Sequence, residues 1–159
     1  MPLRSRIERL AELNRLAILD TQPERAFDEI TRMLAASLQA PITMVNMLDD
    51  RRDWFKSCIG LKHVESPSET SFCASFFTTT DPVIIVEDTT KDARFMAHPL
   101  VVGPPFIRFY ASARLEVQGE TIGTLCAYDM EPRTVDEEQL TNLQVLASAV
   151  VELLIKRAN

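Results

Sequence analysis

Apolar residues recur at helical spacing in two segments near the start of the chain. Residues 3–19 predict one amphipathic helix, with an apolar side made of Leu3, Ile7, Leu10, Leu13 and Ala17. A second helix follows, and its apolar side comprises Phe27, Ile30, Leu34 and Leu38. Thr21 and Glu24 have the spacing of a capping box and are predicted to start this second helix, which Pro41 ends.

The end of the chain predicts a third amphipathic helix, from Thr134 to about Arg157. Thr134 is the expected N-cap, because Glu137 stands three residues later and completes a second capping box. The apolar stripe of this helix recurs every three or four residues and consists of Leu140, Leu143, Ala147, Val150 and Leu154. Such a stripe can cover a sheet or pair with a helix of another chain, and the sequence leaves both uses open.

Alternating patterns and short apolar runs between these helices predict strands. They are residues 41–48, 53–59, 83–88, 106–117 and 121–129. Turn residues at 49–52 and 118–120 join neighbouring strands into antiparallel hairpins. In the strand at 53–59, alternation places Trp54, Lys56 and Cys58 on one side of the sheet and Phe55, Ser57 and Ile59 on the other.

The remaining middle segments predict loops and short helices. Residues 60–70 form a polar loop, residues 71–80 a short helix, and residues 91–99 a turn or a helix of one to two turns. Strands joined by tight turns make the sheet antiparallel, and the helices at the two ends of the chain can share one of its faces. We therefore expect an α+β domain, a three-layer α/β/α sandwich in which the middle segments cover the second face.

Length and composition narrow the class of protein. The 159 residues suit a single domain over 1–159. The formal net charge of −6 argues against nucleic acid as a partner, since phosphate binding requires a basic surface.

The longest uncharged stretch of the last helix, residues 140–151, is too short to span a bilayer. No signal peptide follows Met1, and three irregularly spaced cysteines form no disulfide framework. These features predict a cytoplasmic protein without a membrane partner.

Six segments together carry a family resemblance: ILDTQPERAFDEIT (18–31), DDRRDWFKSCIGL (49–61), SFCA (71–74), EDTTKDARFMAHPLV (87–101), PPFIRFYASARL (104–115) and IGTLCAYDMEPR (122–133). With them, nearly the whole chain resembles a GAF domain of bacterial signalling proteins. The resemblance implies about six antiparallel strands and a ligand cavity between the sheet and the short helices of the middle third. It also implies homodimers formed through the terminal helices, 1–20 and 135–159, which pass a signal to an attached histidine kinase, diguanylate cyclase or phosphodiesterase.

The resemblance leaves the ligand and any cofactor open, because GAF domains bind cyclic nucleotides, tetrapyrroles, haem, amino acids and other metabolites. The favoured hypothesis is a non-catalytic sensor whose cavity binds a small molecule. Aromatic residues, cysteines and arginines are the predicted ligand-binding residues: Trp54, Phe72, Cys73, Phe76, Arg94, Phe95, Arg108, Tyr110 and Cys126. No metal site is predicted, since the cysteines and histidines lack the paired spacing of zinc ligands.

Cys73 and Arg108 each have two interpretations. Cys73 is a nucleophile if the N-terminus of a helix capped by Ser71 lowers the pKa of its thiol, and otherwise a small apolar side chain in the pocket wall. Arg108 interrupts an apolar strand, where it can clamp a carboxylate or phosphate of a ligand. The alternative for Arg108 is an internal salt bridge to Asp88 or Asp92.

Three other functions remain as alternatives. Free methionine-(R)-sulfoxide reductase is a small enzyme of the same fold with cysteines around the cavity, but the spacing of Cys58, Cys73 and Cys126 does not match its motifs. Bilin-binding relatives join the chromophore to a cysteine that histidine usually follows, whereas Ala74 follows Cys73. The third alternative is a structural dimerisation module that binds no ligand.

Overall fold

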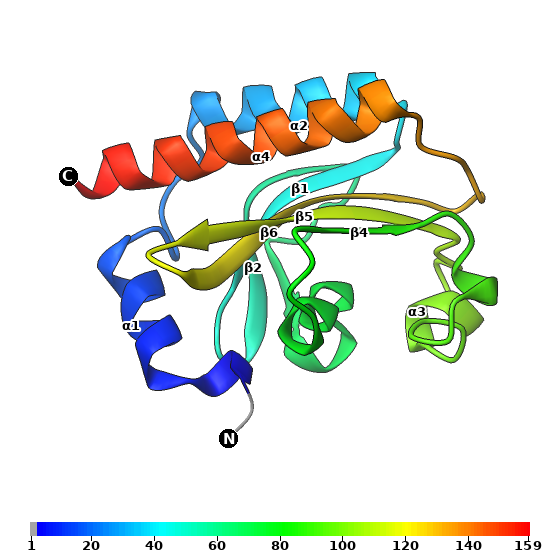
Figure 1. The fold of residues 1–159 in the computed structure, drawn as a ribbon, viewed down its shortest axis with the longest axis horizontal. Coiled ribbons are helices and arrows are strands. Elements are labelled where there is room, and N and C mark those ends of the chain that lie inside the picture. Colours follow the sequence, from blue (N-terminus) through cyan, green and yellow to red (C-terminus); the bar gives the residue numbers. More distant parts are fainter. Residues whose placement is uncertain (1–2) are drawn as a thin grey trace.

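A computed structural model describes residues 3–159 as a six-stranded antiparallel sheet with helices on both faces (Figure 1). The strand order across the sheet is β3-β2-β1-β6-β5-β4. The strands are β1 (Ile42–Leu48), β2 (Arg52–Ile59), β3 (Glu65–Pro67), β4 (Val83–Val86), β5 (Phe109–Val117) and β6 (Glu120–Asp129). The α-helices are α1 (Ile7–Arg15), α2 (Arg25–Leu38), α3 (Pro99–Val102) and α4 (Glu137–Ala158). Four 3₁₀ helices complete the fold: η1 (Leu3–Ser5), η2 (Ser68–Thr70), η3 (Phe72–Thr78) and η4 (Thr89–Lys91). The predicted α+β architecture is confirmed.

The helices α2 and α4 lie side by side on one face of the sheet, because their predicted apolar sides both point toward it (Figure 1). The four residues predicted for the apolar side of α2 are all buried, namely Phe27, Ile30, Leu34 and Leu38. In α4, Leu143, Ala147, Val150 and Leu154 are buried, and Leu140 is half-buried. The apolar stripe of α4 therefore packs in the core of this domain. Pairing of α4 with another chain would need the side of the helix that faces away from the sheet.

The N-terminal segment docks through polar contacts and through only part of the apolar side predicted over 3–19, since Leu13 of that side is buried in the core. Ile7 belongs to that predicted side and is 71% exposed, whereas Arg4 and Arg9 are buried. The Arg9 guanidinium donates to the carbonyl oxygens of Arg4, at 2.6 and 2.8 Å, and of Leu48, at 2.6 Å. The single long helix is a wrong prediction, because hydrogen bonds from arginines to the backbone fix this segment as a short 3₁₀ turn followed by α1.

The start of α2 lacks the predicted capping box. Glu24 precedes the helix, but its side chain makes no cap hydrogen bond. The Glu24 carboxylate and the Thr21 hydroxyl instead accept from Nζ of Lys56, at 2.6 and 2.8 Å. The Lys56 side chain is fully buried, and a buried ammonium needs such partners. The capping prediction is wrong because a cation on β2 uses both groups.

The cap of α4 lies two residues beyond the predicted one. Asp136 accepts a hydrogen bond from the backbone N–H of Gln139 at 2.8 Å, and the Gln139 side chain accepts from the backbone N–H of Asp136 at 3.0 Å. The capping box is thus formed by this pair and not by Thr134 and Glu137. An acidic first turn, with Glu137 and Glu138, further favours the helix start electrostatically.

We expect Asp136→Ala to lower the free energy of unfolding by about 1 kcal/mol, because it removes the acceptor for one backbone N–H of α4. Denaturant unfolding measures this difference. Thr134→Ala is the matched control and should change stability by less than about 0.5 kcal/mol. Equal losses in the two variants would contradict the observed cap.

A β-bulge changes which β2 side chains face the helix layer. The pairs Asn46–Phe55 and Val45–Ser57 leave Lys56 as the extra residue. Trp54 and Lys56 share one side of the sheet as predicted, and that side faces the helices. Ser57 faces the helices too, since its hydroxyl lies 2.8 Å from that of Thr31. Cys58 packs against the core on the opposite face. The predicted alternation is therefore wrong beyond Lys56.

The second face of the sheet is covered by short elements, which lie with α3 opposite the helix layer (Figure 1). The short helix predicted over 71–80 is confirmed as η3. The polar loop predicted over 60–70 is partly wrong, because β3 forms within it and pairs with the start of β2. The segment 83–88 forms β4 at an edge of the sheet, next to β5. Within residues 3–159, no helix has both the length and the apolarity needed to cross a membrane.

Candidate functional site

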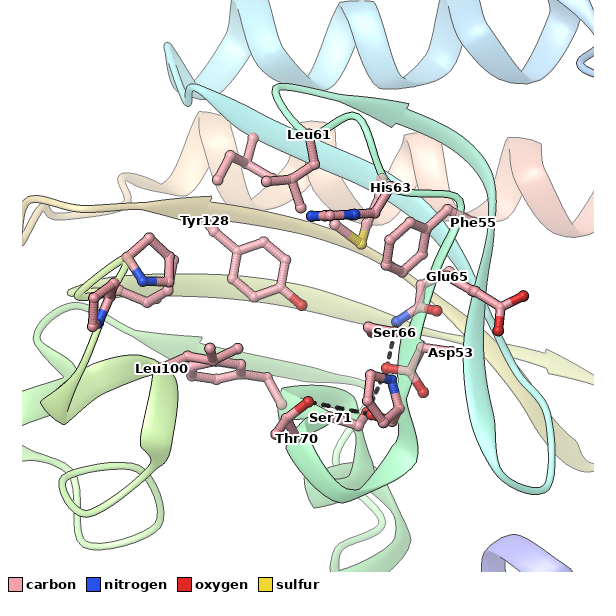
Figure 2. Close-up of a pocket in the computed structure, with 18 residues that line it drawn as sticks. Asp53, Phe55, Leu61, His63, Glu65, Ser66, Thr70, Ser71, Leu100 and Tyr128 are labelled. Carbon is pink, nitrogen blue, oxygen red and sulfur yellow. Dashed lines mark hydrogen bonds between the residues drawn. The ribbon is translucent and has the colours of Figure 1, made fainter.

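A cavity of about 630 Å³ lies between the second face of the sheet and the short elements that cover it (Figure 2). The apolar and aromatic lining residues are Ile42, Met44, Phe55, Leu61, Pro67, Phe72, Leu100, Pro104, Pro105, Ile107 and Tyr128. The polar lining residues are Asn46, Asp53, His63, Glu65, Ser66, Thr70 and Ser71. A concave, mainly apolar site with a few grouped polar side chains is typical of small-molecule binding.

Asp53 organises the polar corner of this cavity. It is 3% exposed, and its Oδ1 accepts from the Arg4 guanidinium at 2.6 Å. Its Oδ2 accepts from the Ser71 hydroxyl at 2.6 Å and from the Asn46 amide at 3.0 Å (Figure 2). The proposed capping of η3 by Ser71 is wrong, because this hydroxyl donates to Asp53. One carboxylate therefore joins the cavity wall to the N-terminal segment.

Asn46 presents an acceptor without a donor in the same corner. A carboxylate only accepts, so the Asn46 amide nitrogen must face Asp53, and Oδ1 must point elsewhere. Within residues 3–159, this buried Oδ1 has no hydrogen-bond partner. A buried acceptor left unpaired costs about 1–3 kcal/mol, so such atoms commonly mark a position for a water or a ligand.

Phe72 connects the cavity to an aromatic cluster behind it. Its ring stacks on His98 with a centroid distance of 4.3 Å and on Phe95 at 5.0 Å. Tyr110 and Tyr128 lie 5.4 and 5.5 Å from the same ring. These contacts fix the Phe72 side chain and give the cavity a rigid wall.

His98 holds this wall through its neutral imidazole. Its Nδ1 accepts from the Leu100 backbone N–H at 3.0 Å, so the remaining proton belongs on Nε2, 3.2 Å from the Thr70 carbonyl oxygen. Burial lowers the pKa of His98 below the ordinary value of 6.5. Protonation would remove the acceptor for Leu100, which also lines the cavity.

We expect stability to fall as the pH drops below about 6.5, because the unfolded chain then binds a proton that folded His98 resists. Thermal unfolding at pH 7.5 and pH 5.5 measures this loss. His98→Asn keeps a capping acceptor but cannot titrate, so its melting temperature should fall less over the same interval. His63→Asn, at an exposed histidine, should behave like the wild type. An unchanged pH dependence in His98→Asn would refute the assignment.

Two thiols lie buried beyond the cavity wall. Cys73 Sγ is 3.0 Å from the Thr124 hydroxyl and 3.1 Å from the Tyr110 hydroxyl. Burial opposes ionisation of Cys73, but hydrogen bonds from Cys126 and Thr124 outweigh it, so the pKa of Cys73 lies below its usual value. Burial raises the pKa of Cys126 well above its usual value. Neither thiol has exposed surface, so both occupy the place of core side chains.

Of the nine residues predicted to bind a ligand, Phe72 lines the cavity. Five others are buried in the core directly behind it, namely Cys73, Phe76, Phe95, Tyr110 and Cys126. Trp54 packs in the core on the helix face of the sheet, so its placement beside the cavity was wrong. The cause is strand alternation, which points Phe55 rather than Trp54 toward the cavity.

Arg94 and Arg108 also lie outside the cavity lining. Arg94 pairs with Asp92 at 2.8 Å on the surface. Arg108 donates to the carbonyl oxygens of Val101, at 2.8 Å, and Ile107, at 3.2 Å, and makes no ion pair within residues 3–159. The expected salt bridge from Arg108 to Asp88 or Asp92 is wrong, and Arg108 instead ties the start of β5 to α3.

The sequence prediction missed the polar lining residues, of which Asn46 and Asp53 form the polar corner. Asn46 interrupts an otherwise apolar central strand, and such a polar residue needs a partner or a ligand. Asp53 follows a turn rich in charged residues, so the sequence suggests an exposed side chain and not a buried one. Among residues 3–159, no group of three or more histidine, cysteine, aspartate and glutamate side chains is placed to hold a metal ion.

Comparison with known proteins identifies the family. The family model of the GAF domain matches residues 22–153. This chain belongs to the GAF domain family. A cyclic di-GMP phosphodiesterase of Pseudomonas aeruginosa is 39% identical over 126 residues, which are 79% of this chain and 21% of that enzyme. The chain thus spans about a fifth of the length of this relative.

Solved structures, among them a GAF domain, share the fold at low sequence identity. The GAF domain of an Acinetobacter phosphoenolpyruvate-protein phosphotransferase has a TM-score of 0.68 and 16% identity, over 95% of each chain. A type II free methionine-R-sulfoxide reductase from Thermoplasma acidophilum has a TM-score of 0.64 and 15% identity, over 81% of this chain and 89% of its own. At this identity, the likeness shows the fold alone.

Proposed function

We propose that this GAF domain is a cytoplasmic sensory module that binds a small molecule in the cavity and performs no catalysis of its own. The observation that carries the proposal is the cavity itself, which combines apolar walls with the unpaired Oδ1 of Asn46. Both buried thiols lie outside its lining, which disfavours the redox alternative.

A signalling role is supported by the shared contacts of Asp53. The carboxylate bonds Asn46 and Ser71 in the cavity wall and Arg4 in the N-terminal segment. A ligand that changes the wall contacts would shift the docking of that segment if it binds one arrangement more tightly than the other. We propose that an output domain receives this signal, as the phosphodiesterase relative carries much additional chain.

We further propose that two copies pair through the outer side of the helix layer. Met33 on α2 is 58% exposed, and Val145 on α4 is 61% exposed. Ile155 lies farther along α4 and is 40% exposed. These exposed side chains provide apolar surface for pairing, whereas the apolar stripe of α4 is buried against the sheet.

A thermal-shift screen of uncharged, cationic and anionic metabolites tests ligand binding. A ligand at about 100 times its Kd should raise the melting temperature by roughly 5–10 °C. Leu100→Trp should abolish this shift by filling the cavity, whereas Val102→Trp, on the exposed side of the same short helix, should preserve it. Failure of every compound, or an equal shift in Leu100→Trp, would overturn the proposal.

A further inference from the structure

The charges around the cavity are balanced before any ligand enters. Its lining contains two carboxylates, Asp53 and Glu65, and each is already paired with an arginine outside the lining. Arg4 lies 2.6 Å from Asp53, and Arg52 lies 3.0 Å from Glu65. Within residues 3–159, no lysine or arginine lines the cavity. An anionic ligand would therefore be desolvated without forming an ion pair to a lysine or arginine of the lining. It would also come close to two carboxylates.

The hydrogen-bonding requirement of the cavity is equally specific. The Asn46 amide nitrogen donates to Asp53, which leaves Oδ1 as a buried acceptor without a partner among residues 3–159. An oxygen acceptor is satisfied by an N–H or O–H donor and is repelled by another acceptor. No donor among residues 3–159 reaches Asn46 Oδ1, so an N–H or O–H group of a ligand would complete this hydrogen bond.

The aromatic part of the lining favours a flat, apolar body. Phe72 is held rigidly by its stack on His98, and Tyr128 packs edge-on against it with ring centroids 5.5 Å apart, so the two rings form one continuous wall. Burial raises the pKa of Tyr128 well above its usual value, so this wall stays uncharged at neutral pH. Aromatic side chains in such positions bind ring systems by stacking and edge contacts.

Building on the proposed ligand-binding role, we propose that the cavity selects a flat ligand without net negative charge, whose N–H group donates to Asn46 Oδ1. Uncharged or weakly basic nitrogen heterocycles have this chemistry. Phosphate esters and carboxylates, including cyclic nucleotides, do not.

Two matched series of compounds test the class of ligand without altering the protein. The first is indole, 1-methylindole and indole-3-acetate; the second is adenosine, N6,N6-dimethyladenosine and 3′,5′-cyclic AMP. Affinities are measured by titrating the ¹⁵N-labelled domain and following its amide resonances. In each series, the uncharged N–H member should bind about tenfold more tightly than the methylated member and than the anion. Asn46→Ala should erase the difference between indole and 1-methylindole.

A charge added to the cavity wall should reverse the discrimination against anions. Leu61 lines the cavity and is 37% exposed, so Leu61→Arg places a cation at the site without burying it fully. Leu61→Arg should bind indole-3-acetate about tenfold more tightly than the wild type does. Val64→Arg adds the same charge to the same segment at an exposed position outside the cavity, and should leave this affinity unchanged.

The outcomes separate this inference from the proposed function. Tighter binding of the anions, or equal binding of the N–H and N-methyl members, would overturn the ligand class while leaving a ligand-binding cavity. The ligand class would also be overturned, and the ligand-binding cavity kept, if other anions from the metabolite screen bind and none of the six compounds does. Absence of binding by the six compounds and by the whole screen would overturn the proposed function itself.

Discussion

Replacing Asp53 with alanine should lower the free energy of unfolding by about 3–5 kcal/mol, because it leaves the buried Arg4 guanidinium without its counter-charge. The loss also removes the acceptor shared by Ser71 and Asn46, so three segments lose their common contact. Urea unfolding of the purified domain gives the free energy directly. Added salt should recover little of the loss, since the pair is buried.

Asp50→Ala provides the matched control for this prediction. Asp50 belongs to the same turn and accepts from the Ser5 hydroxyl at 2.6 Å, but it is half-buried and pairs with no cation within residues 3–159. Its loss should cost about 1 kcal/mol or less. Pairing Asp53→Ala with Arg4→Met should restore part of the stability, because both charges are then gone. A cost for Asp53→Ala no larger than that of Asp50→Ala would refute the anchoring role.

Gly60→Ala should lower the free energy of unfolding by about 3 kcal/mol or more. Gly60 follows β2 with φ of +91°, a conformation that side chains rarely adopt. A Cβ built at this position would lie 2.1 Å from the Pro41 carbonyl oxygen, so the backbone before β1 would have to move. Thermal or denaturant unfolding measures the effect.

Gly119→Ala separates the cost of the positive φ from the cost of the clash with Pro41. Gly119 also has a positive φ, of +76°, but a Cβ there meets no atom within 4 Å. It should therefore show the backbone cost alone, about 1–2 kcal/mol. Similar losses at Gly60 and Gly119 would show that the contact with Pro41 contributes nothing.

Periodicity predicted the elements whose side chains meet in apolar cores. The residues of α2 that point to the sheet, such as Phe27 and Leu34, follow the helical repeat because burial there depends on one face of a helix. The central strand β1 was predicted from its apolar run instead, because both of its faces are buried along its full length.

Features set by long-range polar contacts could not be predicted in this way. Arg4 and Asp53 are 49 residues apart in sequence, and Lys56 lies 35 residues from its partner Thr21. Each of these side chains would be assigned to the surface by its type, and only folding shows the partner that allows its burial. Most of the predicted site residues lie in the core beside the cavity. The reason is that a cluster of aromatic residues in a sequence is as typical of a core as of a cavity wall.

The central claim is that the ligand occupies the cavity bordered by η2, α3 and the polar corner at Asp53. It is tested most directly by mapping amide chemical shifts of the domain during a titration with indole. The account predicts a saturable change that is largest at residues 61–72 and 100–107. A saturable change confined to the outer side of α2 and α4 would contradict it.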